Sequence, residues 1–232
     1  FAYNGGVLFV EGRRATLLNS NVSDCYAYSY GGAIYILDGE KTRIEASNFD
    51  NCTSITTEGG AIFIDGDFTV VLNSNFTNCN ASSKDGLGGG IYILGEETSI
   101  QNATFDRCTS VDGGAIYIEG NDAHISDSNF IGNVLVNYTD DDNYGGAIYW
   151  VAYTGEIFNS EFSENNARWG GGIYFNGRSA NTNVVNSTFK SNSAVKNGGA
   201  IECNASNIGI YNLTFEDNIA GGYGAALCRE IE

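Results

Sequence analysis

The sequence predicts an all-β protein, a single-stranded parallel β-helix (solenoid) of about nine coils. A glycine-led motif recurs nine times in 232 residues, every 25 to 32 residues. An asparagine-rich motif falls between successive copies. Apolar residues within each copy alternate with a period of two, which is typical of strands and not of helices. A repeat of about 27 residues that holds two or three short strands suits one coil of a solenoid.

The glycine motif supplies the first strand of each coil. Its copies are GGVLFV (5–10), GGAIYI (31–36), GGAIFI (59–64), GGGIYI (88–93), GGAIYI (113–118), GGAIYW (145–150), GGGIYF (170–175), GGAIEC (198–203) and YGAALC (223–228). Equivalent residues of stacked coils lie about 4.8 Å apart, so each column of this alignment becomes a row of neighbouring side chains. The first inward row is Leu8, Ile34, Ile62, Ile91, Ile116, Ile148, Ile173 and Ile201.

The asparagine motif supplies the bend and the strands that follow. Its phenylalanines form another inward row, namely Phe49, Phe76, Phe105, Phe130, Phe162, Phe189 and Phe215. Its asparagines predict a ladder at a corner, because asparagine tolerates the left-handed conformation and its amide can bond to the next one. The ladder comprises Asn19, Asn73, Asn102, Asn159, Asn186 and Asn212. We expect it to bond inward.

Composition excludes several classes of function. The net charge is −17, with 28 acidic against 11 basic residues. Such a charge repels phosphate backbones and anionic lipids, so we expect no nucleic-acid partner and no membrane insertion. No run of 18 apolar residues occurs, and any export signal must lie in a precursor. We expect residues 1–232 to form one domain, either a segment of a longer chain or a subunit that stacks.

The two motifs together carry a family resemblance. The pairing of Gly31-Gly32-Ala33-Ile34 and its copies with a downstream F-x-x-N resembles the repeats of chlamydial polymorphic outer-membrane proteins, and those of large adhesin-like surface proteins. The F-x-x-N copies are 130–133, 162–165, 189–192 and 215–218. The resemblance implies a right-handed coil and an extracellular or surface-displayed role in adhesion or structure. The first four copies depart from it, because cysteine stands where the family has asparagine.

Six cysteines fall into two columns. Cys25, Cys52, Cys79 and Cys108 follow the phenylalanine row, and Cys203 and Cys228 end the glycine motif. Stacked neighbours about 4.8 Å apart lie within disulfide range. We predict Cys203–Cys228, with either Cys25–Cys52 and Cys79–Cys108, or Cys52–Cys79 alone. The alternatives are a reduced stack packed as small hydrophobes and a metal site, for which no C-x-x-C or histidine partner exists.

Nine N-x-S/T sequons occur, which fits a glycosylated surface protein or simply asparagine-rich turns. The predicted glycan acceptors lie at outward or turn positions: Asn21, Asn51, Asn75, Asn80, Asn137 and Asn204. Asn102, Asn186 and Asn212 belong to the predicted inward ladder, and we expect them to be poor acceptors.

Two outward columns are candidate binding surfaces. An aromatic stripe is predicted from Phe9, Tyr35, Phe63, Tyr92, Tyr117, Tyr149 and Tyr174. It could bind a carbohydrate, a neighbouring rod or a covering segment, or could simply stabilise the sheet. Acidic turns could bind structural calcium, with Asp38, Asp65, Asp67 and Glu119 as candidate ligands, or could remain solvated. We expect no other cofactor.

The residues do not favour catalysis. The single histidine, His124, lies in a polar strand, and the basic residues are scattered. No coil breaks the repeat to gather a carboxylate and a base. The sequence therefore predicts a non-enzymatic rod or adhesin, extracellular or on the cell surface, that self-associates head to tail or contacts carbohydrate or a host or neighbouring cell. The alternative is a polysaccharide-binding or polysaccharide-processing domain, similar to pectin lyases, that uses the aromatic stripe.

Overall fold

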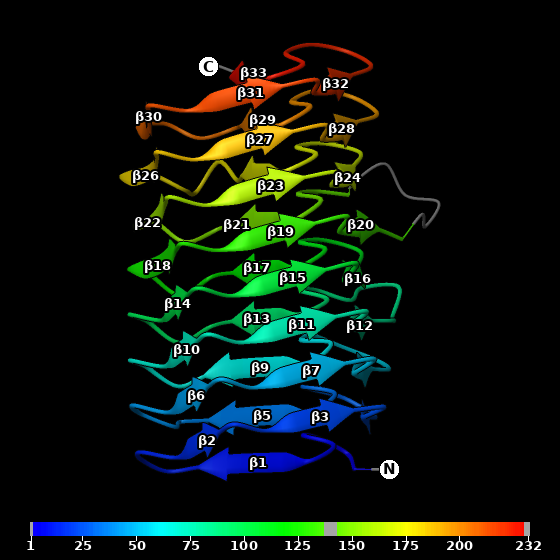
Figure 1. Cartoon of the computed structure of the whole chain (residues 1–232), viewed down its shortest axis with the longest axis vertical. Coiled ribbons are helices and arrows are strands. Elements are labelled where there is room, and N and C mark those ends of the chain that lie inside the picture. Colours follow the sequence, from blue (N-terminus) through cyan, green and yellow to red (C-terminus); the bar gives the residue numbers. More distant parts are fainter. Residues whose placement is uncertain (1, 137–142, 230–232) are drawn as a thin grey trace.

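The computed structural model describes residues 2–136 and 143–229, which form a parallel β-helix. Figure 1 shows the coils stacked along the long axis of the molecule, with the two chain ends at opposite ends of the stack. All the strand pairs are parallel and join adjacent coils. Each complete coil contributes four strands, more than the two or three expected.

The first sheet is formed by the glycine motifs. Its nine strands are β1 (Leu8–Glu11), β5 (Ile34–Leu37), β9 (Ile62–Asp65), β13 (Ile91–Ile93), β17 (Ile116–Ile118), β21 (Ile148–Trp150), β25 (Ile173–Phe175), β29 (Ile201–Cys203) and β33 (Leu227–Arg229). The predicted isoleucine row is confirmed, because Ile34 pairs with Ile62 and Ile91 pairs with Ile116.

The second sheet precedes the asparagine bend. Its eight strands are β2 (Thr16–Leu18), β6 (Arg43–Glu45), β10 (Val70–Leu72), β14 (Ser99–Gln101), β18 (Ala123–Ser126), β22 (Gly155–Phe158), β26 (Thr182–Val185) and β30 (Ile208–Tyr211).

The third sheet follows the bend and carries the phenylalanine row. Its eight strands are β3 (Asn21–Ser23), β7 (Asn48–Asp50), β11 (Asn75–Thr77), β15 (Thr104–Asp106), β19 (Asn129–Ile131), β23 (Glu161–Ser163), β27 (Thr188–Lys190) and β31 (Thr214–Glu216).

The fourth sheet consists of two-residue strands just after the cysteine column. They are β4 (Tyr26–Ala27), β8 (Thr53–Ser54), β12 (Asn80–Ala81), β16 (Thr109–Ser110), β20 (Val134–Leu135), β24 (Asn166–Ala167), β28 (Ser193–Ala194) and β32 (Ile219–Ala220).

Stacked phenylalanine rings run through the core. From Phe49 to Phe189, successive ring centroids lie 4.6–5.1 Å apart and the ring planes agree to within 6°. These rings are at most 1% exposed. Burying an aromatic or branched side chain contributes about 1.5–3 kcal/mol, so this row and the isoleucine row are a large part of the apolar burial that stabilises the fold.

The asparagine bend is built differently from the prediction. Its residues do adopt the left-handed conformation, for example Asn73 at φ 50° and Asn159 at φ 48°. Their side chains lie on the surface, however, and bond to one another there, as in Asn102 Nδ2 to Asn73 Oδ1 at 2.8 Å. The prediction of an inward ladder is therefore wrong.

Serines do the inward bonding at this bend. The Ser47 hydroxyl donates to the Glu45 carbonyl at 2.9 Å and accepts the Ser20 backbone N–H of the preceding coil at 3.2 Å. Ser74 repeats the arrangement with Leu72 and Ser47. These hydroxyls satisfy buried backbone groups that the turn leaves without partners.

Paired glycines allow the coils to approach at the start of the first sheet. Gly31 has φ +59°, and a Cβ built on Gly32 would lie 2.1 Å from the Gly60 carbonyl oxygen.

The last glycine motif is one residue out of the predicted register, because Ile201 pairs with Leu227 and Gly224 takes the place of the first glycine. Across the described ranges, no helix is long and apolar enough to span a membrane.

Replacing Phe105 by alanine should destabilise the protein by about 3–5 kcal/mol, because the ring is sealed between Phe76 and Phe130. The matched control is Phe158→Ala, which removes a surface ring that is 38% exposed and should cost less than about 1 kcal/mol. Urea unfolding followed by far-UV circular dichroism measures both. Equal losses for the two variants would contradict the buried phenylalanine row.

Candidate functional site

The aromatic stripe faces away from the main core but is not exposed. Tyr35, Phe63, Tyr92, Tyr117, Tyr149 and Tyr174 are only 6–8% exposed, and Phe9 alone is open at 47%. They form a second apolar cluster with Tyr30, Leu37, Leu87, Tyr144, Val151 and Trp169. The stripe is therefore not an exposed surface, and of the predicted occupants the covering segment is the one that the structure shows. The chain itself supplies the covering layer.

In four coils the residue before the glycine pair, namely Tyr30, Leu87, Tyr144 or Trp169, packs over the stripe. Tyr30, for example, lies 5.5 Å from Tyr35 and 4.8 Å from Phe63 between ring centroids. The column rings also cover one another, since Tyr92 and Tyr117 stack at 5.2 Å with planes 9° apart. Burial, with the nearby Glu119 carboxylate, raises the pKa of Tyr92. Sugar rings dock on open aromatic faces, and here those faces are occupied.

The acidic turns do not form a column of stacked carboxylates. Leu37 stands between Glu11 and Asp65 in the register of the first sheet, and Asp38 lies one residue beyond that column. Burial raises the pKa of Asp65, with further contributions from Asp38 and Asp67. Within residues 2–136 and 143–229, no three acidic, cysteine or histidine side chains are grouped to hold a metal ion. Structural calcium stays a prediction without support from this geometry.

Four cysteines form the predicted column inside the helix, as free thiols. Cys52, Cys79 and Cys108 are fully buried, and Cys25 is half-buried. Cys79 and Cys108 donate toward carbonyls of the phenylalanine row one coil back, as in Cys79 Sγ to the Phe49 oxygen at 3.6 Å, and Cys52 donates toward the Val22 carbonyl in the same way. This is the reduced stack; the disulfides proposed within it stay predictions.

Cys203 and Cys228 do not share a column. Cys228 pairs with Glu202, and Cys203 pairs with Arg229. Because side chains alternate along a strand, the two thiols point to opposite faces of the first sheet. The predicted Cys203–Cys228 disulfide is therefore wrong, and its cause is the one-residue misalignment of the last glycine motif.

Asparagines take over the cysteine column in the later coils, and they are buried too. Asn165 Nδ2 donates to the Phe130 carbonyl at 3.0 Å and to Asn192 Oδ1 at 2.9 Å. Its Oδ1 accepts the Asn133 backbone N–H at 2.9 Å. Asn133 is 0% exposed and Asn165 1%. The inward asparagine ladder therefore consists of Asn133, Asn165, Asn192 and Asn218. These are the asparagines of the F-x-x-N motif.

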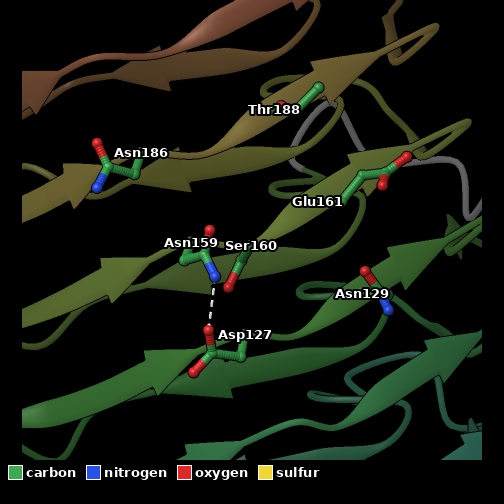
Figure 2. A pocket seen from close by; sticks show the side chains of 7 residues that line it. All are labelled: Asp127, Asn129, Asn159, Ser160, Glu161, Asn186 and Thr188. Carbon is green, nitrogen blue, oxygen red and sulfur yellow. Dashed lines mark hydrogen bonds between the residues drawn. The ribbon is translucent and has the colours of Figure 1, made fainter.

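A polar hollow of about 260 Å³ lies at the asparagine bend, between the second and third sheets. Figure 2 shows its lining side chains, which are Asp127, Asn129, Asn159, Ser160, Glu161, Asn186 and Thr188. Asn159 Nδ2 donates to Asp127 Oδ1 at 2.6 Å, and this bond lowers the pKa of the Asp127 carboxyl. The hollow offers amides, carboxylates and two hydroxyls, which suit a hydroxyl-rich ligand. Sequence reasoning missed it, because the stacking of three separate coils creates it.

The predicted glycan acceptors are spread over several faces. Asn21, Asn51, Asn75 and Asn204 are exposed. Asn80 is half-buried, and its amide oxygen is buried without a hydrogen-bond partner. Asn137 lies outside the described residues. Asn102, Asn186 and Asn212, expected to be hidden, are exposed.

The comparison with protein families agrees with this geometry. Residues 2–189 match the model of the right-handed β-helix region. The chain is a right-handed β-helix protein. Residues 186–204 of this β-helix protein also match the Chlamydia polymorphic membrane protein repeat, which confirms the resemblance seen in the motifs. No curated protein and no solved structure matches the chain.

Exchanging the two residue types of the buried column tests their equivalence. Cys79→Asn should keep stability within about 1 kcal/mol, because the new amide can serve the Phe49 carbonyl as the thiol does. Asn165→Ala should cost about 2–4 kcal/mol, because it leaves the Asn133 N–H buried without its acceptor and removes the amide hydrogen bonds to the Phe130 carbonyl and to Asn192 Oδ1. Urea midpoints measure both. A Cys79→Asn variant as unstable as Asn165→Ala would refute the equivalence.

Stability should fall as the pH rises from about 9 to about 11. Burial, with Cys52 nearby, raises the pKa of Cys25 from 9.0 to about 11. Between these two pKa values the folded state keeps the Cys25 proton while the unfolded chain releases it. The free energy of unfolding is therefore unaffected by Cys25 below about pH 9 and falls as the pH rises from there toward 11. Burial raises the pKa of Cys203 to about 12, in the same direction. Thermal midpoints between pH 7 and 11 measure the effect, and Cys25→Ser should flatten the decline.

Proposed function

We propose that this β-helix protein is a non-catalytic structural or adhesive rod, extracellular and displayed at a cell surface. The observation that carries the proposal is the unbroken register of four sheets along the described coils, in a chain that matches a polymorphic membrane protein repeat. Active sites usually disturb such regularity. The match covers residues 186–204 and supports surface display by analogy.

The outer faces fit contact with a large partner better than turnover of a small one. The third sheet presents mostly polar and charged outward side chains, with asparagine, threonine, serine, aspartate and glutamate among them. The net charge of −17 favours basic patches on a partner and repels anionic lipid. Head-to-tail self-association stays a prediction.

Polysaccharide binding remains the alternative, and it now rests on the polar hollow and no longer on the aromatic stripe. The hollow groups an aspartate, a glutamate and amides within one groove. Its size suits about one sugar ring, since pockets for whole ligands usually begin near 300 Å³.

Surface display and lack of catalysis can be tested together. Antibodies raised against the chain should label intact cells of its source, and mild protease treatment of those cells should remove the label. The purified protein should release no reducing ends or unsaturated products from polysaccharides. Labelling only after permeabilisation, or measurable cleavage, would contradict the proposal.

The alternative has its own control. Asn129→Ala with Thr188→Ala alters the hollow, whereas Thr104→Ala alters the same outer column two coils away from Glu161. In affinity electrophoresis, a polysaccharide in the gel retards a protein that binds it. Retardation that is lost in the Asn129→Ala, Thr188→Ala double variant and kept in Thr104→Ala would favour polysaccharide binding over a purely structural rod.

A further inference from the structure

The asparagine ladders on the surface have a direction. In the third sheet, Asn75 Nδ2 donates to Asn48 Oδ1, and Asn48 Nδ2 donates to Asn21 Oδ1, both at 2.8 Å. At the bend, Asn212 Nδ2 donates to Asn186 Oδ1 at 2.7 Å. In each case one asparagine only accepts, and its own amide nitrogen makes no hydrogen bond in the ladder.

Each ladder contains two glycosylation sequons, one at each end. Asn21 and Asn186 accept, whereas Asn75 and Asn212 donate. All four side chains are exposed, so accessibility does not distinguish the accepting asparagines from the donating ones. They differ in whether the amide nitrogen is already used in a ladder hydrogen bond.

N-glycosylation changes that nitrogen. Nδ2 forms a bond to the anomeric carbon of a sugar phosphate donor, the bond from that carbon to the phosphate oxygen breaks, the phosphate leaves with the electron pair, and one amide proton is released. A sugar ring then occupies space beside a nitrogen that, in a donor asparagine, already lies 2.7–2.8 Å from the preceding coil. The modified amide keeps one N–H, so a donor retains its ladder bond only where the sugar also fits beside the preceding coil, whereas at an acceptor the bonded oxygen is unchanged.

We propose that Asn21 and Asn186 are the N-glycan acceptors of this chain, and that the ladder donors Asn75 and Asn212 stay unmodified. Asn186 also has room beside it, because it borders the 260 Å³ hollow together with Thr188, the hydroxyl residue of its own sequon. Figure 2 shows both side chains at the rim. The proposal rests on the extracellular location proposed above.

Three of the other described sequons fail the same criterion, and the fourth, at Asn80, is set aside because it is half-buried. Asn51 donates to Asp24 at 2.7 Å, Asn102 donates to Asn73 at 2.8 Å, and Asn204 donates to the Tyr174 hydroxyl at 3.3 Å. Asn80 is half-buried, and its amide oxygen is enclosed.

Site mapping tests the proposal directly. The 232-residue chain is secreted from a cell that N-glycosylates, and the glycans are removed with a peptide N-glycosidase, which converts each occupied asparagine to aspartate. Peptide mass spectrometry should find conversion at Asn21 and Asn186 and none at Asn75 and Asn212. Conversion at Asn75 or Asn212 equal to that of its ladder partner, or no conversion at any site, would overturn it.

Matched variants remove a sequon without touching either ladder amide. Thr188→Ala should lose one glycan, seen as a downward shift on a denaturing gel, and Thr214→Ala should lose none. A shift in Thr214→Ala, or none in Thr188→Ala, would overturn the assignment. Antibody labelling of intact source cells reads location without reading glycans, so failure of this proposal is distinguishable from failure of the proposed function.

Discussion

The in-register stacking of coils is the constraint on which the rest of the structure depends. Backbone hydrogen bonds link every coil only to its two neighbours, so each side-chain column repeats about every 4.8 Å. Phenylalanine rings at this spacing stack face to face, and asparagine amides at this spacing bond to one another. A residue type that packs or bonds well in one coil therefore does so in the next coil as well. The sequence repeats because each position has the same kind of neighbour in every coil.

Much of the fold could be predicted from the sequence, because apolar periodicity and stacking act on the same columns. The isoleucine and phenylalanine rows follow from alternation alone, and both pair as predicted. The prediction failed where a column contains a polar residue, since polarity does not say whether a side chain faces water. Ser47 and Asn165 bond inside the helix, whereas Asn73 lies outside it.

The candidate sites were harder to predict than the fold. The tyrosines at 92 and 117 do face away from the core, but the preceding turn folds back over their sheet, and alternation carries no information about that cover. In the last glycine motif Ala225 replaces the second glycine, so the sequence was aligned one residue too early and Cys228 was assigned to the wrong face. The polar hollow joins side chains from three coils and has no local sequence signature.

The change from thiol to amide along one buried column makes the rod mechanically asymmetric. In the later coils, an amide such as Asn165 ties its coil to both neighbours through three groups, whereas Cys79 offers a single weak donor in the same place. The amide-bearing coils thus have more side-chain hydrogen bonds to their neighbours than the thiol-bearing coils, and we expect the thiol-bearing coils to separate first under tension along the axis.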